Sequence, residues 1–245
     1  MDGYGPDSYG EGMADVYDEW YRGVSDVEGA VARLREWAGG GSVLELGVGT
    51  GRLAVPLAAT GLAVWGVDAS PAMVERLRAR PGGEDVHAVL GDMAELDVEP
   101  PEPFRLAFVA YNTFFNLTTE AAQRRCLARV RDLLAPGGRL AVEAFVPSEE
   151  GQQDQDVRVR SLAADRVVLA VSRRDPATQT AAGQYVDITE QGIKLRPWRI
   201  RYLWPEQLDA LAGEAGLALE GRWGGWRDEP FDHHAERHVS LYRRA

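Results

Sequence analysis

The spacing of apolar residues divides the chain into two regions with different periodicities. In the first region, helical spacing alternates with short apolar runs at residues 42–46, 62–67, 86–90, 104–110 and 139–145. Near-continuous apolar strands that alternate with helices are typical of a parallel sheet covered on both faces. We therefore predict a doubly wound α/β fold for this region.

Local signals place the helices of this region. Residues 13–38 repeat apolar positions every three or four residues, which predicts a helix, and residues 53–58 open another. Ser70 and Thr119 each stand immediately before a helical segment, as N-cap residues do. We expect residues 1–12, rich in Gly, Tyr and Asp, to be ordered only where they dock on another part of the molecule.

The periodicity changes after Pro147. Strand-like segments then follow at residues 157–162, 166–174, 183–189 and 199–203. Apolar and polar residues alternate in them, which indicates an antiparallel sheet with one face in water or at an interface. A helix over residues 205–215 and strands at 217–223 and 238–242 restore the first pattern. The antiparallel sheet is therefore predicted to be an insertion into the α/β fold.

Charge and cysteine content exclude several classes of protein. The 245 residues include 27 Lys and Arg against 38 Asp and Glu, a net charge of −11, which argues against nucleic-acid binding. Cys126 is the one cysteine, so an internal disulfide is excluded and a reducing compartment is favoured. No apolar run approaches the roughly 18–20 residues that cross a bilayer, and the start of the chain does not resemble a signal peptide. We expect a soluble cytoplasmic protein.

A glycine-rich turn follows the first strand. Its sequence is Glu45-Leu46-Gly47-Val48-Gly49-Thr50-Gly51-Arg52. Glycines let a ligand approach the backbone, and the helix that follows offers free N–H groups. Arg52 stands where a dinucleotide-binding loop has its third glycine, which counts against a nicotinamide cofactor. Asp68 and Asp92 end the next two strands, where open α/β sheets bind ligands. A tight turn and a helix cap are the alternatives for the loop and for Asp68.

These blocks together resemble the class I S-adenosylmethionine-dependent methyltransferases over residues 42–145 and 205–243. The resemblance also rests on Gly66-Val67-Asp68-Ala69-Ser70-Pro71-Ala72-Met73, Gly91-Asp92-Met93, Leu134-Ala135-Pro136-Gly137-Gly138 and Trp204-Pro205-Glu206-Gln207-Leu208. It implies a Rossmann-like, seven-stranded, mostly parallel sheet with a small antiparallel sheet inserted after the fifth strand. It also implies S-adenosylmethionine (SAM) as cofactor and S-adenosylhomocysteine (SAH) as product.

The resemblance implies a role for each block. Residues 45–51 would line the methionine moiety, Asp68 would bind the ribose, Met73 and Met93 would flank the adenine, and Asp92 would bind its amino group. The full set implied to bind the cofactor is Tyr17, Glu45, Gly47, Val48, Gly49, Thr50, Gly51, Arg52, Asp68, Ala69, Met73, Gly91, Asp92, Met93 and Tyr111.

The segment Tyr17-Asp18-Glu19-Trp20-Tyr21 is similar to the Tyr-Asp-x-x-Tyr helix of small-molecule N-methyltransferases, both glycine-type and antibiotic amino-sugar enzymes. In these enzymes the first tyrosine reaches the cofactor and the substrate, and the loop after the fourth strand faces the methyl group. The resemblance therefore implies catalytic roles for Tyr17, Tyr111, Asn112 and Asn116. The amino-sugar enzymes tend to carry histidine where Asn116 stands. His234 is a candidate general base, with an ordinary surface loop as the alternative. We expect no metal.

The favoured function is methyl transfer to a small natural-product intermediate, in the first place the amine of an amino sugar, often nucleotide-linked. Alternatives are an O-methyltransferase, a nicotinamide-dependent oxidoreductase and a non-enzymatic SAM-binding protein. The absence of an evident base favours nitrogen, because a hydroxyl must lose its proton during attack. The expected organisation is a helical lid at 1–41, a SAM-binding core at 42–146, an inserted sheet at 147–204 and the end of the core at 205–245. Exposed edges on the inserted sheet favour a homodimer; we expect no nucleic-acid or membrane partner.

Overall fold

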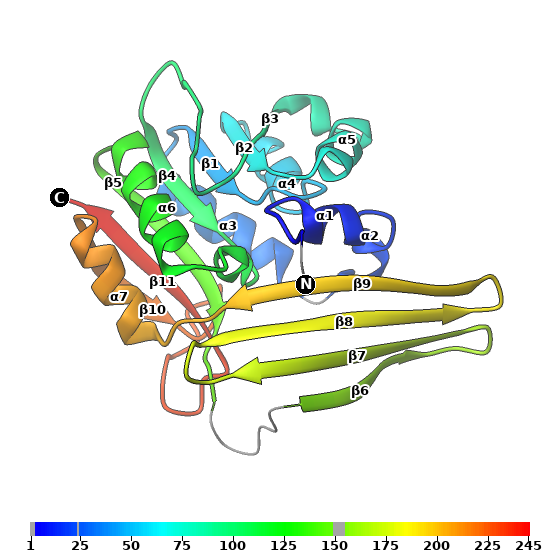
Figure 1. Ribbon diagram of the computed structural model, residues 1–245. Helices are drawn as coiled ribbons and strands as arrows, with labels where there is room; N and C mark the ends of the chain where they lie inside the picture. Colours follow the sequence, from blue (N-terminus) through cyan, green and yellow to red (C-terminus); the bar gives the residue numbers. More distant parts are fainter. Residues whose placement is uncertain (1–2, 24, 149–154) are drawn as a thin grey trace.

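The computed structural model describes residues 3–23, 25–148 and 155–245, and its architecture is α/β (Figure 1). The helices are α1 (Ser8–Met13), α2 (Tyr17–Trp20), α3 (Val27–Ala38), α4 (Ala54–Ala58), α5 (Pro71–Ala79), α6 (Glu120–Leu133) and α7 (Pro205–Glu214), with 3₁₀ turns at Gly83–Asp85 and Thr113–Asn116. The strands are β1 (Val43–Leu46), β2 (Val64–Asp68), β3 (Val86–Leu90), β4 (Phe104–Val109), β5 (Leu134–Phe145), β6 (Gln155–Leu162), β7 (Arg166–Asp175), β8 (Thr180–Thr189), β9 (Gly192–Arg201), β10 (Leu217–Trp223) and β11 (Arg237–Arg244).

Seven strands form the central sheet in the order β10-β11-β5-β4-β1-β2-β3. The pairs from β5 to β3 are parallel, and β11 is antiparallel to both β5 and β10. Apolar residues of α6 and α7 cover one face, whereas those of α3, α4 and α5 cover the other. The predicted fold class is confirmed, and the carboxyl ends of β1, β2 and β3 lie side by side at one edge.

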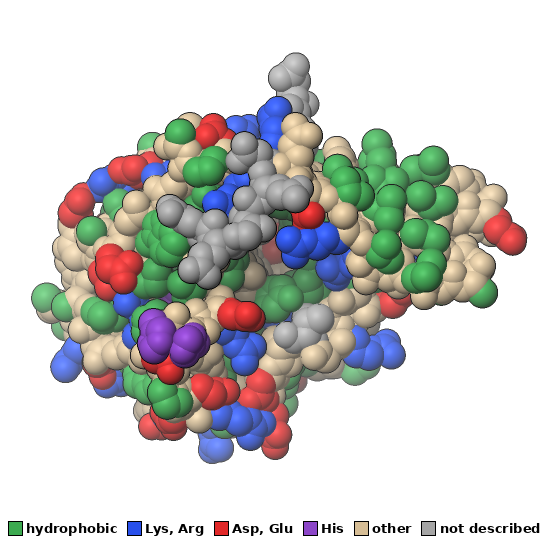
Figure 2. All heavy atoms as spheres, turned by 90° about the horizontal axis from the view of Figure 1, so that it is seen from below, with side chains coloured by type: hydrophobic (Ala, Val, Ile, Leu, Met, Phe, Trp, Pro, Cys, Tyr) green, Lys and Arg blue, Asp and Glu red, His purple; other side chains and the backbone are tan. Residues whose placement is uncertain are grey.

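β6 to β9 form a second, antiparallel sheet in sequence order, drawn as the long yellow-green arm in Figure 1. One face packs on the N-terminal helices, and there Arg196 pairs with Asp15 of the segment after α1 and with the buried Asp187. The other face, which we call the outer face, carries rows of apolar residues. They are Val157, Val171 and Pro197; Val159, Leu169, Val186 and Leu195; and Leu162, Val167, Ile188 and Ile193. Figure 2 shows these rows as part of a green field over the arm.

The helix caps were predicted correctly. The hydroxyl of Ser70 accepts a hydrogen bond from Met73 N at 3.2 Å, and that of Thr119 accepts one from Ala122 N at 3.1 Å. Both bonds satisfy backbone N–H groups that have no partner inside the helix.

Two local predictions were wrong. Residues 13–38 do not form one helix: Gly23, at φ +77°, lies in the break before α3, which begins only where Asp26 caps it. The last inserted strand is Gly192–Arg201 and not 199–203, because the tight turn after Thr189 was missed. The expectation that the N-terminal residues are ordered where they dock agrees with α1, which packs between the core and β9. No described helix is long and apolar enough to span a bilayer.

Candidate functional site

A cavity lies at the carboxyl ends of β1, β2 and β3, where open α/β sheets bind their ligands. We call it the strand-end cavity. Its lining contains many of the residues implied to bind the cofactor, namely Tyr17, Gly47, Gly49, Asp68, Ala69, Met73, Gly91, Asp92 and Met93. The sequence therefore predicted residues from three separate strands that the fold brings together.

The glycine loop is held against β2 by its own backbone. The N–H groups of Gly47 and Val48 both donate to the carbonyl of Val67, at 2.7 and 3.0 Å. Gly47 has φ +68°, and a Cβ there would lie 2.3 Å from Cγ2 of Thr113. A larger residue at Gly47 would strain the backbone and collide with the neighbouring loop.

Asp68 connects this loop to α5. One carboxylate oxygen accepts from Gly49 N at 2.8 Å, and the other accepts from Ser70 N at 2.9 Å. Burial raises the pKa of Asp68, and these two hydrogen bonds oppose the shift. A carboxylate has about four lone-pair sites, so each oxygen of Asp68 can still accept one hydrogen bond from a ligand.

Glu45 is buried at the end of β1, and burial raises the pKa of its carboxyl to about 8. Its Oε2 atom has no hydrogen-bond partner among the described residues. A buried acceptor without a partner is costly, and this oxygen lies beside the glycine loop. A ligand that donates a hydrogen bond here would remove that cost.

Other predicted cofactor residues support the loop without lining the strand-end cavity. Val48 packs under Gly66, and Gly51 fits closely against Val55 and Leu77. The Thr50 hydroxyl donates to Asp18 at 2.7 Å, and Asp18 also pairs with Arg80. The side chain of Arg52 donates to Ser25 and lies 5.7 Å from the ring centre of Tyr111.

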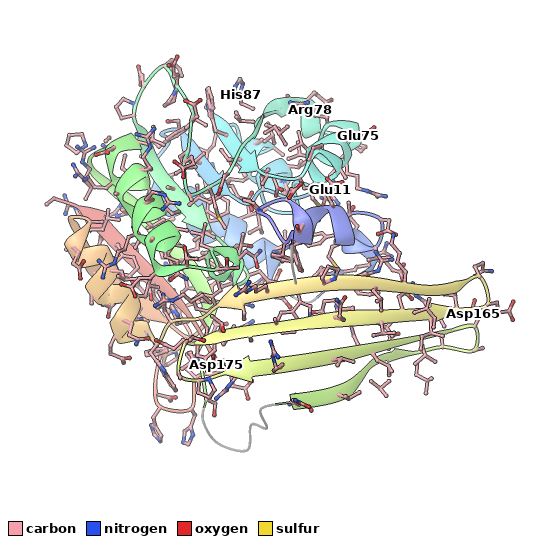
Figure 3. All side chains as sticks on the ribbon, in the orientation of Figure 1. Glu11, Glu75, Arg78, His87, Asp165 and Asp175 are labelled. Carbon is pink, nitrogen blue, oxygen red and sulfur yellow. The ribbon has the colours of Figure 1, made fainter. Side chains whose placement is uncertain are left out.

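The N-terminal segment forms one wall of the strand-end cavity, through Tyr4, Tyr9 and Gly10 among others. Glu11 lies on α1 where it meets the start of α5 (Figure 3), and its carboxylate accepts from Ser70 Oγ at 2.6 Å and Ala72 N at 3.0 Å. These two hydrogen bonds tie the wall that contains Tyr9 to the start of α5.

A second cavity adjoins the first and shares Tyr9, Tyr17, Thr113 and Asn116 with it. Aromatic side chains dominate its lining, so we call it the aromatic cavity. The remaining residues that line it are Tyr21, Tyr111, Asn112, Phe145, Arg160, Tyr185, Trp198 and Ile200. It therefore contains Tyr17, Tyr111, Asn112 and Asn116, four of the five residues predicted to be catalytic.

Tyrosine rings contact one another across this cavity. Tyr17 stacks on Tyr21 at 4.6 Å between ring centres, and Tyr21 meets Tyr111 edge-on at 5.5 Å. The hydroxyls of Tyr9 and Tyr21 are 2.7 Å apart. Burial raises the pKa of Tyr17 to about 12, and it also raises the pKa values of Tyr9, Tyr21 and Tyr111. These phenols therefore remain protonated at neutral pH.

The loop after β4 has an unusual backbone. Tyr111 and Asn112 have φ of +50° and +66°, in the left-handed region that residues other than glycine rarely occupy. Glu143 of β5 holds this conformation, since its carboxylate accepts from Tyr111 N at 2.9 Å. The side-chain oxygen of Asn112 accepts from Phe145 N at 2.6 Å. Such conformations concentrate at functional sites, where the surrounding structure enforces them.

His234 is not brought to either cavity. It is exposed in the loop between β10 and β11, where its ring centre lies 3.9 Å from that of His233 with the two rings tilted by 41°. Figure 2 shows histidines at the surface of this face. His238 is buried in β11, where its Nδ1 lies 2.8 Å from Ser240 Oγ. The described residues contain no cluster of three or more potential metal ligands. We therefore assign His234 no part in the site.

Tyr4, Tyr21, Thr113, Arg160, Tyr185 and Trp198 line these cavities although sequence reasoning did not assign them to the site. Two signals were available in the sequence. One is the i,i+4 spacing of Tyr17 and Tyr21; the other is the alternation of Arg158 and Arg160 with valines, which is compatible with a solvated strand face or with binding a substrate phosphate or carboxylate. The contributions of the second sheet depend on how it folds back over the N-terminal helices, which no local pattern reveals.

Comparison with known proteins agrees with this geometry. Residues 43–138 match the family model described as a methyltransferase domain. The structure of the CcbJ methyltransferase from Streptomyces caelestis is 37% identical, with a TM-score of 0.90 over 99% of this chain and 100% of that one. The cypemycin N-terminal methyltransferase of a Streptomyces species is 29% identical over 92% of this chain and 93% of its own length.

SAM-bound CalS10, described as an amino pentose methyltransferase from Micromonospora echinaspora, shares the fold at 22% identity. Its TM-score is 0.69 over 94% of this chain and 97% of that one. The strand-end cavity offers a buried carboxylate with spare acceptor sites, Asp68, and a glycine loop that a ligand can approach closely. The chain belongs to the class I S-adenosylmethionine-dependent methyltransferases, and S-adenosylmethionine is its cofactor.

Proposed function

We propose that the protein transfers the methyl group of SAM to the amine nitrogen of a small natural-product intermediate, in the first place an amino sugar. The observation that supports this proposal is the absence of a general base from the described lining of the aromatic cavity. Its described lining has no carboxylate and no imidazole, and the pKa of its Tyr17 is raised to about 12. A hydroxyl acceptor needs a base during attack, whereas an amine that arrives neutral needs only to be positioned.

The proposed roles of Asp68 and Asp92 follow from the cavity that they line: Asp68 would accept the ribose hydroxyls, and Asp92 would bind the adenine amino group. Met73 and Met93 line the same cavity and would contact the adenine ring. Glu45 lines neither cavity, and its unpartnered Oε2 atom supports the proposal that it accepts from the amino group of the methionine moiety. SAM supplies an electrophilic methyl group on a sulfonium, so the protein has no leaving group to activate.

Tyr17 and Asn116 line both cavities and therefore lie where the cofactor and the acceptor would meet. We propose that they hydrogen-bond the acceptor amine and hold its lone pair towards the methyl group. Asn112 and Tyr111 would shape the loop, since β5 already engages the backbone of Tyr111 and the side chain of Asn112. The rings that surround them would exclude water from the reacting atoms.

The names of relatives support an amine acceptor. Cypemycin N-terminal methyltransferase is named for an N-terminus, and CalS10 is described as acting on an amino pentose. Both belong to natural-product chemistry by their names, and the acidic surface of this chain does not favour a nucleic acid.

The test is to incubate the protein with SAM and a panel of amino sugars, and to locate the new methyl group by tandem mass spectrometry. We expect methyl on nitrogen. We also expect the rate at subsaturating acceptor to rise with pH until the acceptor's own ammonium is deprotonated, and then to level off. A methyl group on oxygen would overturn the assignment in favour of an O-methyltransferase.

A further inference from the structure

Four arginines of the second sheet alternate with apolar residues, and the structure separates their environments. Arg158 pairs with Asp156 on the same strand. Arg201 pairs with Glu120 of α6, and Arg199 lines a different hollow, away from the aromatic cavity. Arg160 alone among the four lines the aromatic cavity.

Arg160 is held in place by aromatic rings. Its guanidinium carbon lies 5.0 Å from the ring centres of both Trp20 and Tyr185, and 5.4 Å from that of Tyr21. One guanidinium nitrogen donates to the carbonyl of Trp20 at 3.3 Å. Stacking of this kind restricts a long side chain, so less conformational entropy is lost when the guanidinium binds a ligand.

A β-bulge aims this side chain. Val159 pairs with Leu169 and Ser161 pairs with Val168, so Arg160 is the extra residue in β6. Bulges redirect side chains and are over-represented beside active sites. Arg158, two residues earlier, lies in regular register opposite Ala170 and points its charge to solvent.

The charge of Arg160 is unbalanced. No carboxylate pairs with it among the described residues, and it is the one charged side chain in the described lining of the aromatic cavity. The neighbouring cations are paired instead: Arg166 with Asp187 and Glu19, and Arg196 with Asp187 and Asp15. A guanidinium with free donors in a cavity wall matches the paired oxygens of a carboxylate or a phosphate.

We infer that the acceptor carries an anionic group, a carboxylate or a phosphate, which pairs with Arg160 while its amine lies between Tyr17 and Asn116. This inference rests on the proposed function for the position of the amine. It makes Arg160 a determinant of acceptor specificity that takes no part in methyl transfer itself.

The test uses two matched pairs of amines. One pair is a thymidine-diphosphate-linked amino sugar and the same amino sugar without the nucleotide; the other is a dipeptide with a free carboxylate and its carboxamide. Calorimetry measures the binding of each compound to the SAH complex of the wild type, Arg160→Gln, Arg160→Lys and the control Arg158→Gln. The first pair reports on phosphate and the second on carboxylate.

We expect the wild type to bind the anionic member of at least one pair about tenfold or more tightly than its neutral partner, the range of one charge-assisted hydrogen bond. Arg160→Gln should abolish this preference, Arg160→Lys should restore part of it, and Arg158→Gln should leave it unchanged. An undiminished preference in Arg160→Gln, or no preference in the wild type for either pair, would overturn the inference. Because binding to the SAH complex needs no turnover, these outcomes are independent of whether the methyl group is found on nitrogen or oxygen.

Discussion

Replacing Asp68 with alanine tests the assignment of the strand-end cavity most directly. The carboxylate accepts two internal hydrogen bonds, from Gly49 N and Ser70 N, and keeps one free acceptor site on each oxygen. We propose that the two ribose hydroxyls of the cofactor use those sites. The substitution therefore removes two ligand bonds and also leaves two backbone N–H groups without their acceptor.

The magnitude follows from the charge of the acceptor. A hydrogen bond to a charged group contributes about 1.5–3 kcal/mol, so losing two should weaken cofactor binding by roughly 3–6 kcal/mol, or ~10²–10⁴-fold. Asp68→Asn keeps one acceptor oxygen but no charge, and it turns an NH₂ group towards one backbone N–H. We expect the cofactor affinity of Asp68→Asn to lie between those of the wild type and the alanine variant.

Titration calorimetry with SAH measures the effect, and thermal denaturation without ligand shows whether each variant is folded. Asp97→Ala is the matched control, because Asp97 is an exposed carboxylate that does not line the strand-end cavity. A folded Asp68→Ala protein with wild-type affinity for SAH would refute the proposed role of Asp68.

Three further predictions concern the acceptor site, stability and assembly. Tyr17→Phe should lower kcat about 10–100-fold through lost positioning, while His234→Ala stays near wild type; equal losses in the two variants would contradict the proposed site. Burial lowers the pKa of His238 to about 4, below the pKa of about 6.5 that a histidine has in an unfolded chain. Above pH 6.5 the neutral imidazole costs the fold nothing. As the pH falls from about 6.5 to about 4, protonation favours the unfolded state, and the free energy of unfolding should drop by ~3 kcal/mol. In urea unfolding, the free energy of unfolding should fall less with acid in His238→Gln than in the wild type. An identical pH dependence in the two proteins would contradict this prediction. We propose a homodimer through the outer face, where Val159 and Leu195 are 63% and 58% exposed. Leu195→Glu should then sediment as a monomer and the control Leu219→Glu as a dimer. A wild-type protein that sediments as a monomer at micromolar concentration would exclude the dimer.

Periodicity was sufficient for β1 to β4 of the central sheet because these strands are short, largely apolar and bounded by turns. The carboxyl-end positions of Asp68 and Asp92 followed from that alternation, since parallel strands point the same way. The N-terminal helices were harder to predict. Their apolar spacing runs through residues 13–38 without interruption, and the break lies in local signals that apolar spacing does not register: Gly23 at positive φ and the N-cap Asp26.

The acceptor side of the site could be predicted only in part. Tyr17, Tyr111 and Asn116 were found through resemblance, whereas Tyr185 and Trp198 belong to strands whose partners are defined only in three dimensions. His234 was proposed because a loop at the end of the sheet was expected to return to the substrate. In the structure that loop does not line either cavity. Neither the charge pattern nor the periodicity of the sequence indicates the direction in which the loop leaves the sheet.

The wall that the N-terminal segment contributes to the strand-end cavity has a kinetic consequence. Tyr4, Tyr9 and Gly10 border the space for the cofactor, and Glu11 and Asp18 tie this segment to the core. We expect cofactor exchange to require this segment to lift and so to break those contacts, whereas the acceptor would enter the neighbouring aromatic cavity. We expect SAM to bind before the acceptor and SAH to leave last, with release slower than chemistry. Rapid-mixing experiments should then show a pre-steady-state burst of methylated product, because the first turnover of each enzyme molecule is faster than the later ones.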